Sequence, residues 1–174
     1  MYKLEKVILV DDNDNELGSI EKMEAHRQAL LHRAISVFIV NHEGKWLIQR
    51  RAINKYHSGG LWTNTCCTHP QPGETSIQAA NRRLNEEMGI KTTLTEIFQF
   101  KYKDLLDNEL TEHELDHVFI GIADEKPIIN ITEVAEWKYI SYNHLIADIN
   151  KHPESFTVWF RRIVERVNQH VNQK

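Results

Sequence analysis

The sequence predicts an α/β (α+β) fold in which one mixed β-sheet is sandwiched between helices. Candidate strands and helices follow one another without the regular strand–helix–strand repeat of a parallel sheet. Two apolar runs flank a turn sequence at residues 41–44, which predicts an antiparallel hairpin. Residues 76–88 have the apolar spacing of an amphipathic helix. A hairpin and such a helix together favour a sheet with helices packed against it.

The first half of the chain is expected to consist mainly of strands. Residues 4–10 read as a strand, and residues 19–31 as a helix that begins with a serine and carries alanines and leucines. The hairpin supplies strands at residues 34–40 and 46–49. A short strand at residues 61–65 then leads into the only two cysteines.

The strongest helix signal covers residues 76–88. Thr75 and Gln78 have the spacing of a capping box at its start. Gly89 is a natural stop, because glycine readily adopts the left-handed conformation found at helix ends. The expected apolar stripe consists of Ile77, Ala80, Leu84 and Met88.

The second half of the chain mixes strands and helices. Strands are expected at residues 97–102, 112–123 and 137–140, and helices at residues 142–149 and 153–171. The sequence has no repeat at a fixed period and no linker-like segment between these elements.

Length and charge limit the possible functions. A chain of 174 residues suits one domain, which we expect to span residues 1–174. With 41% hydrophobic and 26% charged residues, it can form a core and remain soluble. The net charge of −4 gives no general attraction to nucleic acid or membranes, so neither is an expected partner. An anionic ligand would need a local basic pocket.

The expected location is the cytoplasm. The apolar run at residues 7–10 is too short for a signal peptide and is followed by Asp11 and Asp12. No stretch approaches the roughly 18 apolar residues of a membrane span. The adjacent Cys66 and Cys67 cannot form a disulfide scaffold, which fits a reducing compartment.

The helix at residues 76–88 carries a charged motif. Arg82 and Glu86, like Arg83 and Glu87, are four residues apart, and such pairs are ordinarily surface ion pairs worth about 0.3–0.5 kcal/mol each. Glu74 precedes the helix, and Glu86 and Glu87 are adjacent near its end, so the helix is also a candidate metal site. Clustered carboxylates hold a divalent cation, usually Mg²⁺ shared with phosphate oxygens, and neighbouring arginines neutralise a diphosphate.

A second motif, "EHELDH", opens an apolar strand. The two-residue period of a strand places Glu112, Glu114 and Asp116 on one face, and His113 and His117 on the other. Carboxylates at the mouth of a buried face are costly unless they are paired or bound to metal. We keep the two glutamates as candidates and assign Asp116 to a solvated strand end.

Three histidines are candidate metal ligands. His26 and His32 bracket the end of the first expected helix, and His69 follows the cysteine pair. With Glu112 and Glu114 they would form a nitrogen and oxygen site for Zn²⁺, Mn²⁺ or Mg²⁺, although spacing alone does not show that they meet. The histidines read as ordinary surface or core residues are His42, His57, His144, His152 and His170.

Basic residues offer a site for an anion. The segment "QRRAINK" supplies Arg50, Arg51 and Lys55, and Lys22 lies in the first expected helix. Each alone is ordinarily a solvated surface charge. Together with Arg83 they could form a local anion pocket in an otherwise acidic protein.

The charged helix resembles the Nudix motif. The matching positions are Glu74, Arg82, Leu84, Glu86, Glu87, Gly89 and Ile90. Two positions depart, because Thr68 stands where the motif begins with glycine and Arg83 replaces a glutamate of the Nudix metal site. An arginine there favours binding of a diphosphate over its cleavage.

Nearly the whole chain resembles the type I isopentenyl-diphosphate Δ-isomerases, a Nudix-related family. The segments that carry the resemblance include "IEKMEAH", "LHRAIS", "QRRAINK", "GLWTNTCCTHP" and "EHELDHVF". The resemblance implies a Nudix-like fold and interconversion of isopentenyl and dimethylallyl diphosphate in isoprenoid biosynthesis. In this reaction one face of the alkene is protonated and a proton is removed from the other.

The resemblance also implies roles for individual residues. Cys67 would be catalytic, Glu114 its partner acid or base, and Tyr102 an active-site tyrosine. The implied ligands of Mn²⁺, Zn²⁺ or Mg²⁺ are His26, His32, His69, Glu112 and Glu114. Glu87 would contact a second metal, the Mg²⁺ that arrives with the diphosphate. The implied substrate-binding residues are Lys22, Arg51, Lys55, Arg83 and Trp159, with Trp159 over the hydrocarbon.

The two cysteines are not expected to be equivalent. If strand geometry continues through them, Cys66 and Cys67 face opposite sides, and His69 shares the face of Cys67. We therefore expect packing from Cys66 and proton transfer from Cys67. A monomer or weak dimer is the expected assembly.

Two other functions are compatible with the sequence. Glu74, Glu86 and Glu87 favour a Nudix pyrophosphohydrolase of a nucleoside diphosphate derivative, whereas Arg83 and the cysteine–histidine segment count against it. A non-enzymatic metal-binding module would use the histidines and glutamates structurally, but it leaves Cys67 without a role.

Overall fold

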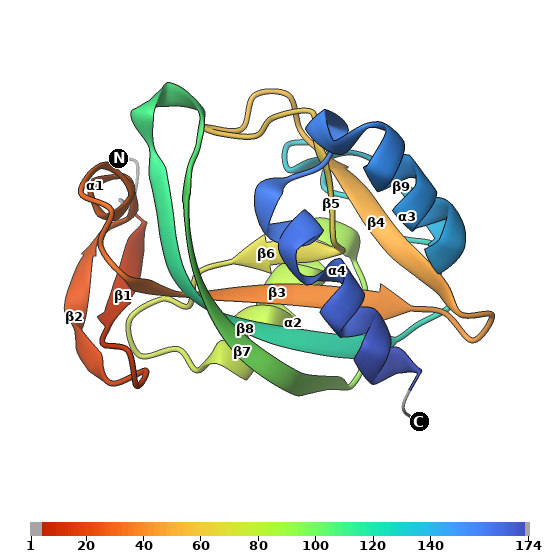
Figure 1. Ribbon diagram of the computed structural model, residues 1–174. Helices are drawn as coiled ribbons and strands as arrows, with labels where there is room; N and C mark the ends of the chain where they lie inside the picture. Colours follow the sequence, from red (N-terminus) through yellow and green to blue (C-terminus); the bar gives the residue numbers. More distant parts are fainter. Residues whose placement is uncertain (1–4, 173–174) are drawn as a thin grey trace.

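The computed structural model describes residues 5–172, in which one mixed sheet of nine strands is covered by helices (Figure 1). This arrangement confirms the expected fold class. The strands are β1 (Lys6–Val10), β2 (Glu16–Glu21), β3 (His32–Val40), β4 (Lys45–Arg51), β5 (Trp62–Thr63), β6 (Cys66–Thr68), β7 (Leu94–Leu105), β8 (Thr111–Ile122) and β9 (Val134–Ser141). The helices are α1 (Lys22–Arg27), α2 (Ser76–Met88), α3 (Tyr142–Lys151) and α4 (Val158–Val171), with short 3₁₀ turns at η1 (Asp107–Glu109) and η2 (Pro153–Ser155).

Strand β3 lies at the centre of the sheet (Figure 1). It pairs with β1, β4 and β6 in the antiparallel direction and with β8 in the parallel direction. These registers place His32 opposite Glu114 and Ser36 opposite Cys67. The long β7–β8 hairpin places Tyr102 opposite Glu114. Strands from distant parts of the chain thus bring candidate site residues together.

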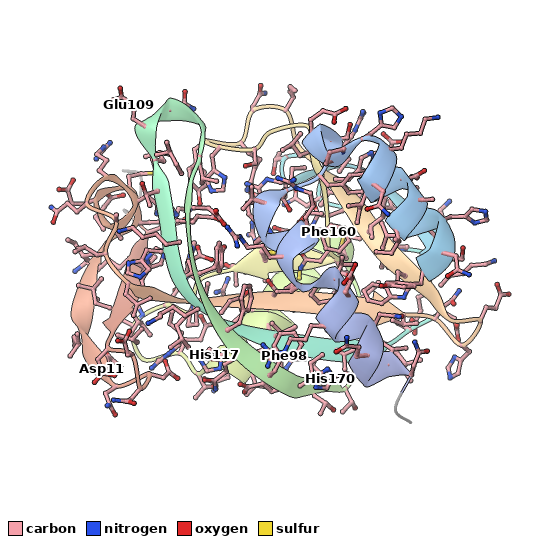
Figure 2. The ribbon with its side chains drawn as sticks, in the orientation of Figure 1. Asp11, Phe98, Glu109, His117, Phe160 and His170 are labelled. Atoms are coloured by element: carbon pink, nitrogen blue, oxygen red, sulfur yellow. The ribbon has the colours of Figure 1, made fainter. Side chains whose placement is uncertain are left out.

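Different helices pack against the two faces of the sheet. Ala80 and Leu84 of α2 pack with Cys66 on one face. Helices α3 and α4 cover the other face, where Phe160 lies over the sheet with its ring centroid 6.0 Å from that of Phe38 (Figure 2). Cys67 packs against this second cluster. The expectation that the two cysteines face opposite sides is therefore confirmed.

The structure confirms the α2 prediction, including both ends. Thr75 Oγ1 accepts a hydrogen bond from the backbone N–H of Gln78, whose side chain accepts one from the backbone N–H of Thr75. Gly89 ends the helix in the left-handed conformation with φ of 65°. One detail was wrong, because Ile77 is 39% exposed and lies outside the buried stripe.

The helix expected at residues 19–31 is wrong over most of its length. Its first residues belong to β2, because they pair with β1. Helix α1 begins only after Glu21, whose carboxylate accepts hydrogen bonds from the backbone N–H groups of Met23 and Glu24, both at 2.9 Å. The chain leaves the helix through Ala29, which has a positive φ of 53°. His26 therefore lies in α1, and His32 opens β3.

The other expected elements exist with shifted ends. The strand expected at residues 97–102 is part of the longer β7. The strand expected at residues 61–65 is shorter, because β5 covers only Trp62–Thr63, and β6 begins at Cys66. The last helix begins at Val158, after the separate η2 turn. Leu4, the first residue of the first expected strand, lies outside the described residues. Within residues 5–172, the helices lack the length and apolar character that a membrane span requires.

Candidate active site

A polar cavity of about 300 Å³ opens where α1, β3, β6, β8, α2 and α4 approach one another. Its lining includes every residue to which the family resemblance assigned a role, except His26 and His32. These two histidines are fully buried and lie beside His69, with ring centroids 5.6 and 5.0 Å from it. The structure thus brings all the predicted residues into one region.

Backbone carbonyls fix the orientation of two imidazoles. His26 Nδ1 donates to the Lys22 carbonyl and His32 Nδ1 donates to the Leu30 carbonyl, both at 2.8 Å. The Nε2 atoms of both rings are buried and have no hydrogen-bond partner among the described residues. Because Nδ1 carries the proton, each Nε2 presents a lone pair. This is the arrangement of metal-binding histidines, whose second nitrogen donates to a carbonyl.

Glu114 lies among these imidazoles. Its Oε1 is 2.9 Å from His69 Nε2 and 3.5 Å from His32 Nε2. One ligand atom from each of these residues and from His26 lies within 4.8 Å of all the others. Burial lowers the pKa of His69 to about 4, so the ring is neutral at pH 7, as a metal ligand must be. Neutral imidazoles, orphaned nitrogens and a carboxylate together fit a divalent metal ion.

Tyr102 links Glu114 to Glu112. Its Oη is 2.7 Å from Glu114 Oε2 and 2.8 Å from Glu112 Oε2. Burial and the neighbouring Glu114 raise the pKa of Glu112. Burial also opposes the ionisation of Glu114, but the neighbouring imidazoles, with His69 Nε2 as a hydrogen-bond donor at 2.9 Å, outweigh it and lower the pKa of Glu114. Since a phenol has one proton, Tyr102 can donate to only one of these two carboxylates at a time.

Cys67 presents a protonated thiol to the cavity. Burial raises its pKa to about 12, so the sulfur keeps its proton at neutral pH. The thiol donates to Asn64 Oδ1 at 3.1 Å and lies 3.6 Å from the hydroxyl of Ser36. Cys66 is fully buried beneath α2 and does not line the cavity.

Asp116 was assigned wrongly to a solvated strand end. It is only 1% exposed, and its Oδ2 accepts a hydrogen bond from Ser36 Oγ at 2.7 Å. The side chain is buried because β8 is covered on both edges, by β3 and by β7. The two-residue period that selected Glu112 and Glu114 was the signal for this third acid. Ser36 and Asn64 gave no signal of their own in the sequence.

Acidic side chains neutralise the predicted anion-binding residues. Arg83 forms ion pairs with Glu133 and, at 2.6 Å, with Glu87. Lys55 also pairs with Glu133, and Lys22 pairs with Glu5. Sequence reasoning missed Glu5 and Glu133, because both lie far along the chain from their partners.

The three candidate acids of the charged helix have different surroundings. Glu87 is 5% exposed, lines the cavity and accepts a hydrogen bond from Gln49 Nε2 at 2.6 Å. Glu74 lies outside the lining and pairs with Arg82 at 2.7 Å. Glu86 is exposed at the rim and also pairs with Arg82. Of these three acids, only Glu87 is a buried carboxylate that faces the cavity.

Trp159 and Arg51 close the cavity on the side of α4. Trp159 is 3% exposed, and the guanidinium carbon of Arg51 lies 5.4 Å from its ring centroid. Trp159 therefore belongs both to the core and to the cavity wall. His117, on the other face of β8, contacts Asp14 and Glu96 instead of the cavity (Figure 2).

Comparison with known proteins identifies the family. The NUDIX domain model matches residues 30–160. The chain is 50% identical over 164 residues to the isopentenyl-diphosphate Δ-isomerase of Pectobacterium atrosepticum, covering 94% of this chain and 92% of that one. It is 47% identical over 163 residues to isopentenyl-diphosphate Δ-isomerase 2 of Aromatoleum aromaticum, covering 94% and 86%. The chain belongs to the isopentenyl-diphosphate Δ-isomerase family of the Nudix superfamily.

Solved structures agree on the fold of this isomerase family member. DR0079 from Deinococcus radiodurans superposes with a TM-score of 0.79 at 23% identity, covering 93% of this chain and 98% of that one. A MutT protein from Methanosarcina mazei gives a TM-score of 0.68 at 21% identity, covering 83% and 96%. At such identities the likeness concerns the fold alone.

Proposed function

We propose that this isomerase interconverts isopentenyl and dimethylallyl diphosphate, with Cys67 and Glu114 exchanging protons with the alkene. The observation that carries the proposal is that a thiol and a carboxylate line one cavity beside a cluster of cations. The product would enter isoprenoid biosynthesis.

The two proton-transfer groups suit this chemistry. Protonation of an unactivated alkene creates a tertiary carbocation, which needs a proton donor in a site that excludes water. The Cys67 thiol keeps its proton at neutral pH, whereas Glu114 is ionised and receives a hydrogen bond from Tyr102. A thiol and a carboxylate can each serve as donor or acceptor, so the pair would support both directions.

Trp159 would face the hydrocarbon of the substrate. Its indole ring lines the cavity and is held by packing within the α4 cluster. A carbocation near an aromatic face gains about 0.5–2 kcal/mol by a cation–π contact. Trp159 would therefore stabilise the intermediate and keep water away from it.

The diphosphate would bind where acids now hold the basic side chains. Lys22, Arg51, Lys55 and Arg83 all line the cavity. Glu87 would contact a Mg²⁺ ion that arrives with the diphosphate, because Mg²⁺ prefers one or two carboxylates together with phosphate oxygens. Arg83 takes a position that belongs to a metal-binding glutamate in the Nudix motif, which favours binding without hydrolysis.

A second divalent ion, Mn²⁺, Zn²⁺ or Mg²⁺, would be held at the buried end of the cavity. The proposed ligands are His26, His32, His69, Glu112 and Glu114. The ion would fix the direction of Glu114 and tune its basicity. The protein residues would carry out the proton transfers themselves.

An assay in heavy water tests this function. The full chain is incubated with isopentenyl diphosphate, Mg²⁺ and Mn²⁺, and the products are followed by NMR. The proposal predicts dimethylallyl diphosphate that carries deuterium. Release of phosphate without rearrangement would instead indicate a Nudix hydrolase, and an unchanged substrate would indicate a binding module.

A further inference from the structure

His57 is a fourth imidazole at the buried end of the cavity, and it was not among the ligands expected from the sequence. Its side chain is 3% exposed, and its Nε2 lies 3.5 Å from Glu112 Oε1. Its ring centroid lies 6.0 Å from that of His26. Ligand atoms of His26, His57 and Glu112 lie within 4.8 Å of one another. These residues form a second donor group that overlaps the first.

The loop between β4 and β5 turns His57 inward. Arg51 Nη2 donates to the His57 carbonyl at 3.2 Å. The following Ser58 and Gly60 both have positive φ, 51° and 77°. A side chain at Gly59 would meet the Ile53 carbonyl oxygen at 2.3 Å, so only glycine fits there. This backbone holds the imidazole between Tyr56 and Trp159, with ring centroids 4.3 and 5.8 Å away.

The orientation of the ring points one nitrogen at the site. His57 Nδ1 lies 3.2 Å from Ser58 Oγ, which leaves Nε2 as the nitrogen that faces Glu112. An imidazole nitrogen near a carboxylate in a buried, polar pocket is the usual donor pair for a transition metal. His57 therefore has both the burial and the direction of a ligand.

The two donor groups share His26, and this decides how they act together. His26 has a single free lone pair, on Nε2, because its Nδ1 donates to the Lys22 carbonyl. One lone pair binds one ion. Both groups can use His26 at the same time only if they surround the same ion. Tyr102 already joins the two groups by contacting Glu112 and Glu114.

We propose that His57 is a further ligand of the metal centre, so that one ion is held by four imidazoles and two carboxylates. This inference rests on the centre proposed above from His26, His32, His69, Glu112 and Glu114. Six donors match octahedral coordination, which is typical of Mn²⁺ and not of Zn²⁺. Four of them are nitrogens, which favours Mn²⁺, Fe²⁺, Co²⁺ or Zn²⁺ over Mg²⁺, an ion that prefers oxygen.

Two other roles for His57 make different predictions. As a hydrogen-bond partner of Glu112, it would support a ligand without touching the ion. As a packing partner of Trp159, it would have no effect on metal binding. A count of metal-bound nitrogens separates these roles from direct ligation, because only a ligand adds a nitrogen to the ion.

The experiment uses the full chain, stripped of metal by a chelator and reloaded with Mn²⁺. Pulsed electron paramagnetic resonance, with ¹⁴N- and ¹⁵N-histidine, counts the directly bound nitrogens, and chelator competition gives the dissociation constant. We expect four nitrogens in the unmodified chain and three in His57→Ala. We also expect the dissociation constant to rise about 10- to 100-fold or more in the variant.

His113→Ala is the matched control. His113 lies between Glu112 and Glu114 in the sequence but donates from Nδ1 to the Ala29 carbonyl at 2.9 Å, outside both donor groups. This change should keep four nitrogens and the original affinity. If His57→Ala fails to fold, His57→Gln replaces it, because glutamine fills the space without an imidazole. Three bound nitrogens are expected in that variant too.

Three bound nitrogens in the unmodified chain would overturn the role of His57 while leaving the proposed centre intact. A weaker affinity in His57→Ala with an unchanged nitrogen count would also overturn it, because His57 would then act only through Glu112. If the unmodified chain binds no divalent ion, the proposed centre itself is wrong.

Discussion

The Cys67 thiol donates a hydrogen bond to Asn64 Oδ1 at 3.1 Å. The Asn64 amide in turn donates to the Val37 and Cys66 carbonyls, at 3.1 and 2.9 Å, and so cannot turn away. The thiol therefore lies in a fixed place on the wall of the cavity, with its proton held until a better acceptor arrives.

Replacement of Cys67 by alanine should reduce turnover by at least about 10²- to 10⁴-fold, the usual contribution of a positioned proton donor or acceptor. Cys66→Ala should retain most of the activity and lose about 1 kcal/mol of stability, because it shortens a fully buried side chain. Rate measurements and urea unfolding of both variants check this. Equal losses of activity would contradict the different roles of the two cysteines.

Asp116→Asn should stabilise the protein at high pH. Burial raises the pKa of Asp116 above its unfolded value, with a smaller effect from Glu114. The folded state then binds the proton more tightly, so the free energy of unfolding falls as pH rises from about 4 through the folded pKa. An amide removes this loss, so the free energy of unfolding of the variant should exceed that of the unmodified chain at high pH.

Urea unfolding of the metal-free protein at pH 5 and pH 8 tests the Asp116 prediction. Asp148→Asn is the control, since Asp148 is a half-exposed acid on α3. The variant Asp116→Asn should gain more at pH 8 than at pH 5, whereas the control should change little. A gain that is independent of pH would show that Asp116 is not protonated by its surroundings.

Glu133→Gln should strengthen substrate binding. Glu133 now neutralises both Lys55 and Arg83, so the diphosphate must displace it. Removing its charge should lower KM about 2- to 5-fold, the range of partly exposed ion pairs, and change kcat little. Steady-state kinetics should show no such effect for Glu136→Gln, because Glu136 pairs with the half-exposed Arg50. A higher KM would mean that Glu133 itself helps to bind substrate.

Trp159→Leu should lower kcat by about 2- to 30-fold, which corresponds to the loss of a cation–π contact. Trp159→Phe should lose less, because it keeps an aromatic face. Both variants remove part of the α4 packing, so their thermal stabilities should fall together. If kcat followed stability in both variants, the indole would act only through packing.

Local signals predicted local structure well. The α2 helix was predicted with both of its ends, because a capping box and a C-terminal glycine act within a few residues. The helix expected at residues 19–31 failed because pairing of β2 with β1 overrides the helical preference of its first residues. Propensity cannot register such a partner when it lies elsewhere in the chain.

The site residues that were predicted have local signals in the sequence, whereas those that were missed depend on contacts between distant parts of the chain. His26, His32, His69, Glu112 and Glu114 were candidates from the sequence, and the structure places them in two donor groups that share His26. Asp116 was misjudged because its burial depends on two neighbouring strands. His57 was missed because the conformation of the loop at residues 52–61, between β4 and β5, directs it inward, and no spacing in the sequence signals this. The ion pairs of Glu133 depend in the same way on the approach of the loop after β4, which carries Lys55, and helix α2, which carries Arg83.

The central claim is that Cys67 and Glu114 act on opposite faces of the substrate. A crystal structure of Cys67→Ala with isopentenyl diphosphate, Mg²⁺ and Mn²⁺ bound tests it most directly. The account predicts that the double bond lies between Cβ of residue 67 and the carboxylate of Glu114, with the diphosphate on Lys55 and Arg83. A double bond that points away from residue 67, or that has both residues on the same face, would contradict it.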